Sequence, residues 1–250
     1  MTPYQYGALN PISNIDMNGD SVWVTHNTGF LGLGKKETLR YDDGNLYNKD
    51  GSAYGGKVKG FLKDAVGALN TLAEGDEGGK DLKEMESSTV NTSIVHSSDG
   101  NSYSPDATGH GGTVNFDPSS GQGGLDTKGS GDRPSYIGLG HELLGHGLDN
   151  ERGTLNTGMI PGAGIPYAEQ FSTHIENMLR AEHLLPLRAF YGVDATGAGT
   201  YPLINGAGQS LFYNNYDYNN MNGLRTAPIR LIVPASTLSP ATIRPIKITP

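Results

Sequence analysis

The chain has 250 residues, a formal net charge of −8 and no cysteine. The acidic balance argues against nucleic acid as a partner, because phosphate groups are bound by Lys and Arg. Without cysteine, disulfides and thiolate ligands are excluded, so a metal site must use histidine and carboxylate side chains. We expect no membrane span, since no apolar run approaches the ~18 residues that one needs. We expect no signal peptide either, since the N-terminus lacks a basic start and an apolar stretch.

Short stretches of alternating or β-branched residues predict strands in the first half of the chain. After a polar, turn-rich lead over residues 1–20, we expect strands at 21–25, one or two hairpins within 38–55, and strands at 89–96 and 113–116. Residues 97–112 and 119–131 are rich in Gly, Ser and Asp and are predicted to be loops. With the helices described next, these strands indicate an α+β fold with a small, mainly antiparallel sheet.

Apolar residues that recur with helical spacing, together with start and stop signals, predict the helices. They cover residues 58–73, 81–86, 132–149 and 166–185. Gly75, Gly78 and Gly79 are expected to end the first of these helices, and Asp132 is a candidate N-cap of the third. Farther on, residues 213–222 are predicted to form an exposed loop and residues 231–233 a strand.

The helix at 132–149 carries a candidate metal-binding motif, His141-Glu142-Leu143-Leu144-Gly145-His146. In the H-E-x-x-H motif, two histidines four residues apart share one zinc ion, and the Glu between them acts on a bound water. Here the histidines are five residues apart, which places them ~140° apart on an ideal α-helix. A single π-bulge would bring them back to one side, and Gly145 is the residue that best tolerates the distortion. The motif therefore predicts a zinc site and a widened helical turn near Gly145.

A tetrahedral catalytic zinc site needs a third protein ligand besides His141 and His146. The helix at 166–185 carries one polar stripe, Glu169, Thr173, Glu176 and Arg180. We expect Glu169, 23 residues after His146, to be the third ligand.

Other roles for this stripe stay open. Glu176 is the alternative ligand, or a residue that orients a ligand histidine through a hydrogen bond. Asp149 could also bond to a histidine, and is a weaker ligand candidate. In the simplest interpretation, the stripe is a solvated helix face with an ion pair between Glu176 and Arg180.

These residues predict peptide-bond hydrolysis by a zinc-bound water, with Glu142 as the general base. The expected cofactor is Zn²⁺ and the expected partner a peptide or protein substrate. The donor that stabilises the oxyanion is left open among Tyr167, His174 and Tyr191.

The order of elements resembles that of the NleD-like effector metallopeptidases and their RHS-linked relatives. The shared features are Leu-Arg-Tyr at 39–41, an amphipathic helix, an Arg-Pro before a Gly-His-Glu helix that is followed by Asp, and Glu-Asn and Arg at 176, 177 and 180. The resemblance covers roughly residues 38–190 and implies a zincin-like core with two ligand-bearing helices. It also implies that the strand at 113–116 is a sheet edge that pairs with an extended substrate. The family usually has four-residue histidine spacing, so this chain departs from it in local helix geometry.

Two shorter resemblances add to this interpretation. The letters HELLGH are those of the zinc motif of dipeptidyl peptidase III, a match that covers these residues and Gly147. Residues 1–20 resemble the closing motif of the RHS-repeat core, so we expect a remnant at 1–20 and a metallopeptidase domain at 21–250. The implied protein is a toxin or effector that is secreted or delivered to another cell without a signal peptide, and otherwise cytoplasmic. An immunity protein would be a further partner.

Two other functions remain open. The five-residue spacing would suit an inactive binding module on a zincin scaffold, if His141 and His146 point apart. A small exopeptidase like dipeptidyl peptidase III would instead need a deep, closed cleft and activity on short peptides.

Overall fold

The computed structural model describes residues 22–28, 34–107, 109, 111–214 and 216–223. The expected remnant at 1–20 and the expected strand at 231–233 lie outside these residues. Among the described helices, none combines the length and the apolar character needed to cross a membrane.

Six strands form one mixed sheet in the order β3-β2-β1-β4-β6-β5. Their bounds are β1 Val22–Asn27, β2 Lys36–Asp42, β3 Asn45–Tyr47, β4 Thr92–His96, β5 Ser102–Pro105 and β6 Gly112–Phe116. The pairs β1–β2, β2–β3 and β5–β6 are antiparallel, whereas β1–β4 and β4–β6 are parallel. The predicted hairpin within 38–55 is confirmed as β2–β3, which turns at Asp43 and Gly44 with positive φ.

The edge of the sheet is not where the resemblance placed it. The expected edge strand at 113–116 is β6, which has β4 on one side and β5 on the other. The end strand on this side of the sheet is β5, within a segment that was predicted to be loop. The sequence Ser-Tyr-Ser-Pro is short and has no buried residue, so its pairing with β6 cannot be read from apolar alternation.

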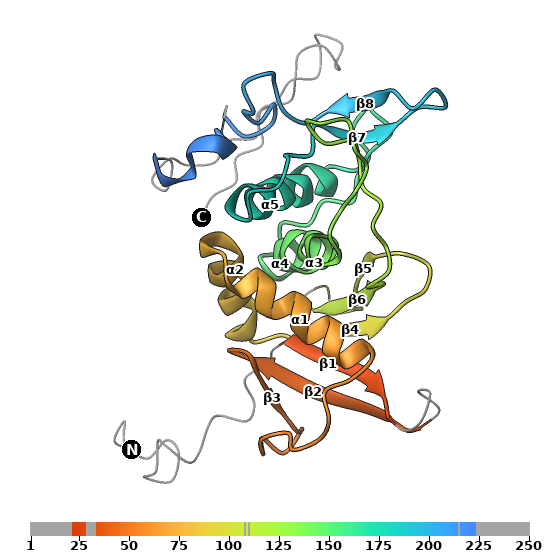
Figure 1. Ribbon diagram of the computed structural model, residues 1–250, viewed down its shortest axis with the longest axis vertical. Coiled ribbons are helices and arrows are strands. Elements are labelled where there is room, and N and C mark those ends of the chain that lie inside the picture. The colour runs from red at the N-terminus through yellow and green to blue at the C-terminus, as the bar shows by residue number, and fades with distance from the viewer. Residues whose placement is uncertain (1–21, 29–33, 108, 110, 215, 224–250) are drawn as a thin grey trace.

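Helices cover one side of the sheet in successive layers (Figure 1). Their bounds are α1 Phe61–Ala73, α2 Asp76–Glu86, α3 Ser135–Gly140, η3 His141–Gly147, α4 Leu148–Glu151 and α5 Ala168–Glu182. Helix α1 lies against the sheet, the continuous helix α3–η3–α4 comes next, and α5 packs on η3. A small hairpin of β7 Phe190–Val193 and β8 Gly199–Pro202 lies beyond α5.

The alternation of apolar residues along the central strands explains this layering. Val24, Ile94 and Val114 lie in register on β1, β4 and β6, and all are fully buried. Leu62 and Leu69 of α1 belong to the same core. Because strand side chains alternate between the two faces, one face of the sheet becomes a continuous apolar surface for the helices.

Helix α2 begins earlier than its sequence suggested. Gly78 and Gly79, predicted to end the preceding helix, lie inside α2. The reason is a contact with α5: the Glu182 carboxylate accepts the backbone N–H of Glu77 at 2.8 Å and of Gly78 at 3.0 Å. These are free N–H groups at a helix N-terminus, so a distant residue completes what the local sequence lacks.

The expectation of an exposed loop at 213–222 is wrong. Tyr213 and Tyr218 are buried, and both contact His174 of α5. The Tyr213 ring stacks on the imidazole at 4.1 Å, and the Tyr218 hydroxyl lies 2.7 Å from His174 Nδ1. A run of Tyr and Asn looks polar in sequence, but its rings cover the outer side of α5.

Candidate metal site

The helix that carries the two histidines widens where the spacing requires it. Residues His141–Gly147 form a π-helix between α3 and α4, which confirms the predicted insertion. The rings of His141 and His146 lie 5.1 Å apart, and each Nε2 faces the carboxylate of Glu169. The wider turn thus offsets the extra residue between the histidines.

Gly145 is required for a different reason from the expected one. A Cβ atom on Gly145 would lie 2.8 Å from the Cα of Ser172 on α5. Similarly, a Cβ on Gly140 would collide with Leu179 of α5. Small residues at these positions let the histidine-bearing helix approach α5 closely enough for side chains from both helices to share one site.

Three donor groups converge between η3 and α5. Glu169 Oε2 lies 3.4 Å from His141 Nε2, and Glu169 Oε1 lies 3.2 Å from His146 Nε2. Ligand atoms of these three residues lie within 4.8 Å of one another. In a tetrahedral site with bonds of roughly 2.0–2.1 Å, ligand atoms are roughly 3.3–3.4 Å apart. The distances from Glu169 to the two Nε2 atoms therefore fit a tetrahedral metal ion with bonds of this length.

The other nitrogen of each imidazole is bonded so as to leave Nε2 free for a ligand. His141 Nδ1 lies 3.1 Å from Glu176 Oε2. His146 Nδ1 lies 2.9 Å from the Ser172 hydroxyl, which itself donates to the Ala168 carbonyl at 3.1 Å. Both partners can thus accept a hydrogen bond from Nδ1–H, so that the neutral rings present their Nε2 lone pairs to the centre.

The electrostatics of the cluster favour a cation between these groups. Burial would lower the pKa of His141, but hydrogen bonds with Glu169 and Glu176 raise it to about 9. Burial would raise the pKa of Glu169, yet its bonds to His141 and His146 hold it well below its ordinary value. The carboxylates thus stabilise positive charge on the imidazole side, which a proton or a metal ion can supply.

Glu176 lies outside the ligand cluster and orients it. The side chain is fully buried, so the interpretation of the polar stripe as a solvated face is wrong. Its pair with Arg180 exists, with Nε–Oε1 at 2.8 Å, and Arg188 Nη1 donates to Oε2 at 2.7 Å. Burial would raise the pKa of Glu176, but the Arg188 guanidinium, together with His141 and Arg180, holds it well below the ordinary value.

Arg188 is the residue that sequence reasoning missed. It follows α5 in a connecting segment and has no helical or strand register with Glu176, so no periodic pattern joins the two. Asp149, the other expected partner of a histidine, instead accepts a hydrogen bond from the Thr154 hydroxyl.

Glu142 lies beside an open groove next to the cluster. The groove has a volume of about 270 Å³ and is lined by Glu142, His146 and Glu169. Its lining also includes Ser102, Tyr103 and Pro105 of the edge strand β5. The carboxylate of Glu142 and the free sheet edge therefore face the same space.

The three expected oxyanion donors separate in space. His174 is buried among tyrosines on the outer side of α5, and burial lowers its pKa to about 3. Tyr191 lies on β7 near the cluster: burial raises its pKa to about 12, and the carboxylates Glu169 and Glu142 add to the rise. Tyr167 directly precedes α5, where its N–H donates to Gly158. Only Tyr191 thus has described interactions with the cluster.

Comparison with protein families gives one match that includes the whole cluster. Residues 48–170 match the model of peptidase family M91, whose description is "Effector protein". The match covers slightly less than half of the chain. The M91 segment contains both histidines, Glu142 and Glu169, whereas Glu176, Arg188 and Tyr191 follow it. Comparisons with curated proteins and with solved structures give no match.

The M91 assignment agrees with the expected resemblance and with the mixed α/β fold. Over residues 48–170 the chain is thus similar to a peptidase family of effector proteins, and the His141–His146–Glu169 group is its candidate metal site.

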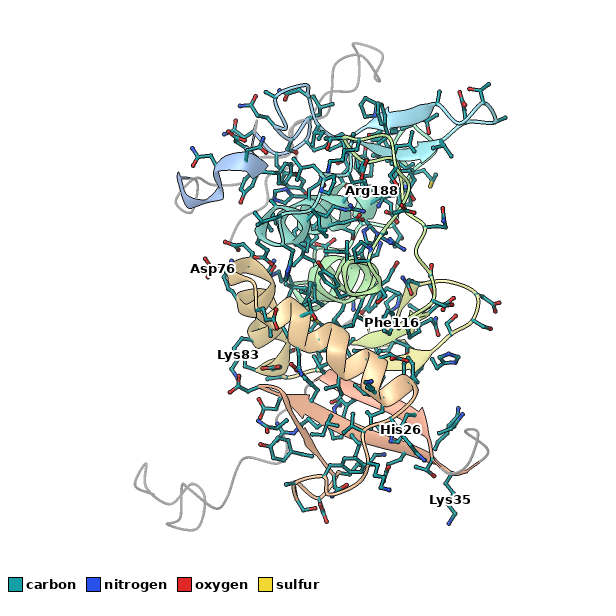
Figure 2. All side chains as sticks on the ribbon, viewed as in Figure 1. His26, Lys35, Asp76, Lys83, Phe116 and Arg188 are labelled. Carbon is teal, nitrogen blue, oxygen red and sulfur yellow. The ribbon has the colours of Figure 1, made fainter. Side chains whose placement is uncertain are left out.

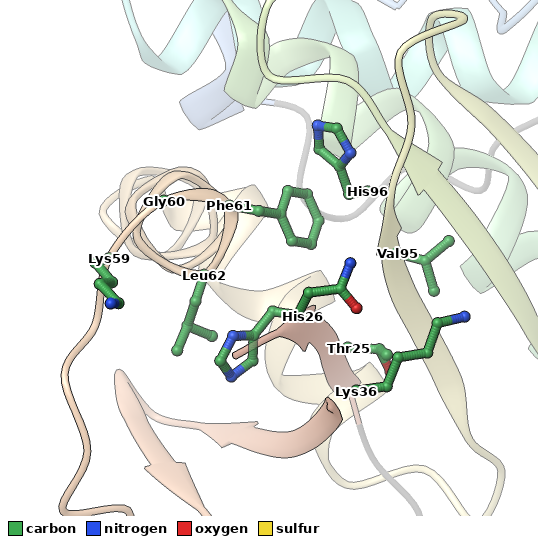
Figure 3. A pocket seen from close by; sticks show the side chains of 10 residues that line it. Thr25, His26, Lys36, Lys59, Gly60, Phe61, Leu62, Val95 and His96 are labelled. Carbon is green, nitrogen blue, oxygen red and sulfur yellow. The ribbon is translucent and has the colours of Figure 1, made fainter. Parts of the chain in front are cut away.

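A second hollow lies away from this cluster. It has a volume of about 620 Å³ and is open between the ends of β1 and β4 and the start of α1 (Figure 3). Its lining includes His26, His96, Lys36 and Lys59 but none of the residues of the metal cluster. We assign the chemistry to the smaller groove because that is where the converging donors and Glu142 lie.

Proposed function

We propose that the chain is a zinc-dependent peptidase in which His141, His146 and Glu169 bind Zn²⁺ and Glu142 is the general base. The observation that carries the proposal is the convergence of both Nε2 atoms on one carboxylate at distances that suit a tetrahedral ion. When bound, zinc would acidify a water molecule and polarise the scissile carbonyl.

The side chains in and near the groove then have three roles: proton transfer, stabilisation of the oxyanion and orientation of the imidazoles. Glu142 accepts a proton from the attacking water and transfers it to the leaving amine. Tyr191, whose phenol is protonated at neutral pH, donates a hydrogen bond to the oxyanion. Glu176 and Ser172 hold the two imidazoles in place through Nδ1.

The free edge of the sheet gives the substrate a place to bind. We propose that an extended substrate pairs with β5, in place of the strand at 113–116, because β5 both ends the sheet and lines the groove. Backbone hydrogen bonds would fix the scissile bond beside Glu142, as in other cases of strand addition.

The inactive binding module is the second candidate. It required histidines that point apart, and the convergence of both Nε2 atoms argues against it. Delivery of the protein to another cell is part of the proposal and is supported by the description of the matched family as an effector. An RHS-derived remnant at residues 1–20 and an immunity protein stay predictions from the sequence.

The test combines metal analysis with a pair of variants. We expect the purified chain to bind about one Zn²⁺ and to cut members of a proteome-derived peptide library. Glu142→Gln should keep the metal and lower cleavage about 10²–10⁴-fold. The matched control is Glu151→Gln, a glutamate of the adjoining α4 that does not line the groove, which should cleave normally.

A chain that binds no zinc would contradict the proposal, as would a Glu142→Gln variant that cleaves like the unaltered protein. Cleavage limited to dipeptides from the ends of short peptides would favour the exopeptidase. Zinc binding without any cleavage of peptides or lysate proteins would favour the inactive module.

A further inference from the structure

Each nitrogen of the Arg188 guanidinium donates a hydrogen bond in the interior of the protein. Arg188 is 6% exposed and lies between α5 and the β7–β8 hairpin (Figure 2). Its Nη1 donates to Glu176 Oε2 at 2.7 Å, and its Nη2 donates to the carbonyl of Tyr191 at 2.7 Å. Its Nε donates to the carbonyl of Phe190 at 3.3 Å. One side chain thus links a buried carboxylate to the strand that carries Tyr191.

The same carboxylate oxygen serves the metal cluster. Glu176 Oε2, which accepts from Arg188, also lies 3.1 Å from His141 Nδ1. Arg180 contacts the other oxygen, Oε1, and its Nη1 donates to the Pro186 carbonyl. The two arginines therefore bond to different oxygens of Glu176. Arg188 bonds to Oε2, which also contacts His141, whereas Arg180 bonds to Oε1.

The backbone around Arg188 is fixed on both sides. Asn177 of α5 accepts the N–H of Arg188 at 2.7 Å and donates to its carbonyl at 3.0 Å. On the other side, a Cβ on Gly124 would collide with the carbonyl of Phe190 and lie 2.7 Å from Arg188 Nε. The backbone at Gly124 thus lies close to the guanidinium and leaves little room for it to move.

We infer that Arg188 is a positioning residue that couples the orientation of His141 to the placement of Tyr191 beside the metal cluster. The inference rests on the proposed function and extends it to a residue outside the M91 match, which ends at residue 170. A guanidinium suits this role because its planar fork can bond to a carboxylate and to two carbonyls at once. A lysine could supply the charge at Glu176 but not the full set of bonds to β7.

Two substitutions separate these tasks. Arg188→Gln removes the positive charge beside Glu176 Oε2, leaves Arg180 on Oε1, and should weaken Zn²⁺ binding about 10–100-fold, measured by calorimetric titration. Arg188→Lys keeps the charge and should bind Zn²⁺ within about threefold of the unaltered chain. Circular dichroism checks that each variant is folded. If Arg188→Gln does not fold, the role of Arg188 is still tested with Arg188→Lys.

The coupling to Tyr191 is tested by combining each variant with Tyr191→Phe. In the unaltered chain, Tyr191→Phe should lower kcat, whereas in Arg188→Lys it should change kcat little, because Tyr191 is already displaced. Arg180→Lys is the matched control: it disturbs the other oxygen of Glu176 and does not contact β7, so Tyr191→Phe should keep its full effect there.

The outcomes distinguish the two proposals. If the unaltered chain binds no Zn²⁺, the proposed function and the role of Arg188 both fail. If it binds Zn²⁺ and cleaves peptide, but Arg188→Gln binds equally well or the effects of Arg188→Lys and Tyr191→Phe are additive, only the role of Arg188 is overturned. If the unaltered chain binds Zn²⁺ but cleaves nothing, the role of Arg188 is tested by the Zn²⁺ affinity of Arg188→Gln alone: an unchanged affinity overturns it.

Discussion

At the scale of single residues, the metal cluster depends on atoms that a motif does not name. The motif supplies His141, Glu142 and His146, but the direction of each imidazole comes from Glu176 and Ser172 on α5. Gly145 belongs to this level as well, because the absence of its side chain lets Ser172 approach. The spacing of the histidines and the contact of the helices are thus separate requirements met within one short segment.

Replacing Gly145 tests the close approach of the helices. Gly145→Ala should destabilise the fold by about 1–3 kcal/mol, because the new Cβ would press on the backbone of Ser172. Gly147→Ala, in the same π-helix, places its Cβ at an ordinary 3.4 Å from Met85 and should be neutral or stabilising by about 0.5–1 kcal/mol. Urea unfolding of both variants measures the difference. Equal stabilities would show that Gly145 is not needed for packing.

At the scale of elements, α5 brings together what the sequence separates. Glu169, Ser172 and Glu176 follow one another at helical spacing on the side of α5 that packs against η3. The opposite side carries His174, which packs on Tyr213 and Tyr218. One helix thus supplies the proposed ligand Glu169, contacts both histidines and anchors the segment that follows β8.

The junction of α4 with the sheet predicts a dependence of stability on pH. Glu151 at the end of α4 accepts a hydrogen bond from Thr92 of β4, and burial raises its pKa from 4.5 to about 7. Between these two values the folded state binds the proton more tightly than the unfolded state does. Stability from this group is therefore present at low pH and is lost as the pH rises through about 7.

Glu151→Gln should remove this loss. After allowance for solvent screening, we expect the variant to be more stable than the unaltered chain by about 1 kcal/mol at pH 8 and equal to it near pH 4. Glu84→Gln is the control of opposite sign, since hydrogen bonds from Arg152 lower the pKa of Glu84. Thermal unfolding at several pH values measures both, and a constant difference between the chains would contradict the prediction.

At the scale of the whole molecule, the metal site joins two layers of the structure. His141 and His146 belong to η3, which lies nearer to the sheet, and Glu169 belongs to the outer helix α5. An ion held by all three would oppose the separation of these layers, and the unfolded chain would lack the converged site. The same layering places the groove between the sheet edge β5 and α5.

Zinc should therefore stabilise the fold as a whole. At a free concentration about 100 times Kd, the gain is about 2.7 kcal/mol, which corresponds to a rise in Tm of roughly 5–10 °C for a chain of this size. Calorimetry with Zn²⁺ and with a chelator measures the shift, and Glu169→Gln should reduce it. Identical Tm values in the two conditions would argue against a site that bridges the layers.

The sequence by itself determined the parts of this protein that depend on local spacing. The helices at 58–73, 132–149 and 166–185 follow from apolar periodicity, and the π-helical turn follows from the five-residue separation of His141 and His146. The meeting of Glu169 with the histidines was also predictable, because a three-ligand site limits the candidates to a nearby helix.

Only the tertiary structure decided the rest, because those features depend on residues that no short pattern connects. Residues that are distant in the sequence determine three features: the edge strand β5, the start of α2, whose N–H groups bond to Glu182, and the burial of Tyr213. Ser172 and Arg188 acquire their roles from a hydroxyl and a guanidinium that reach the cluster through space. Local periodicity fixes which way a side chain faces, whereas packing decides what it meets.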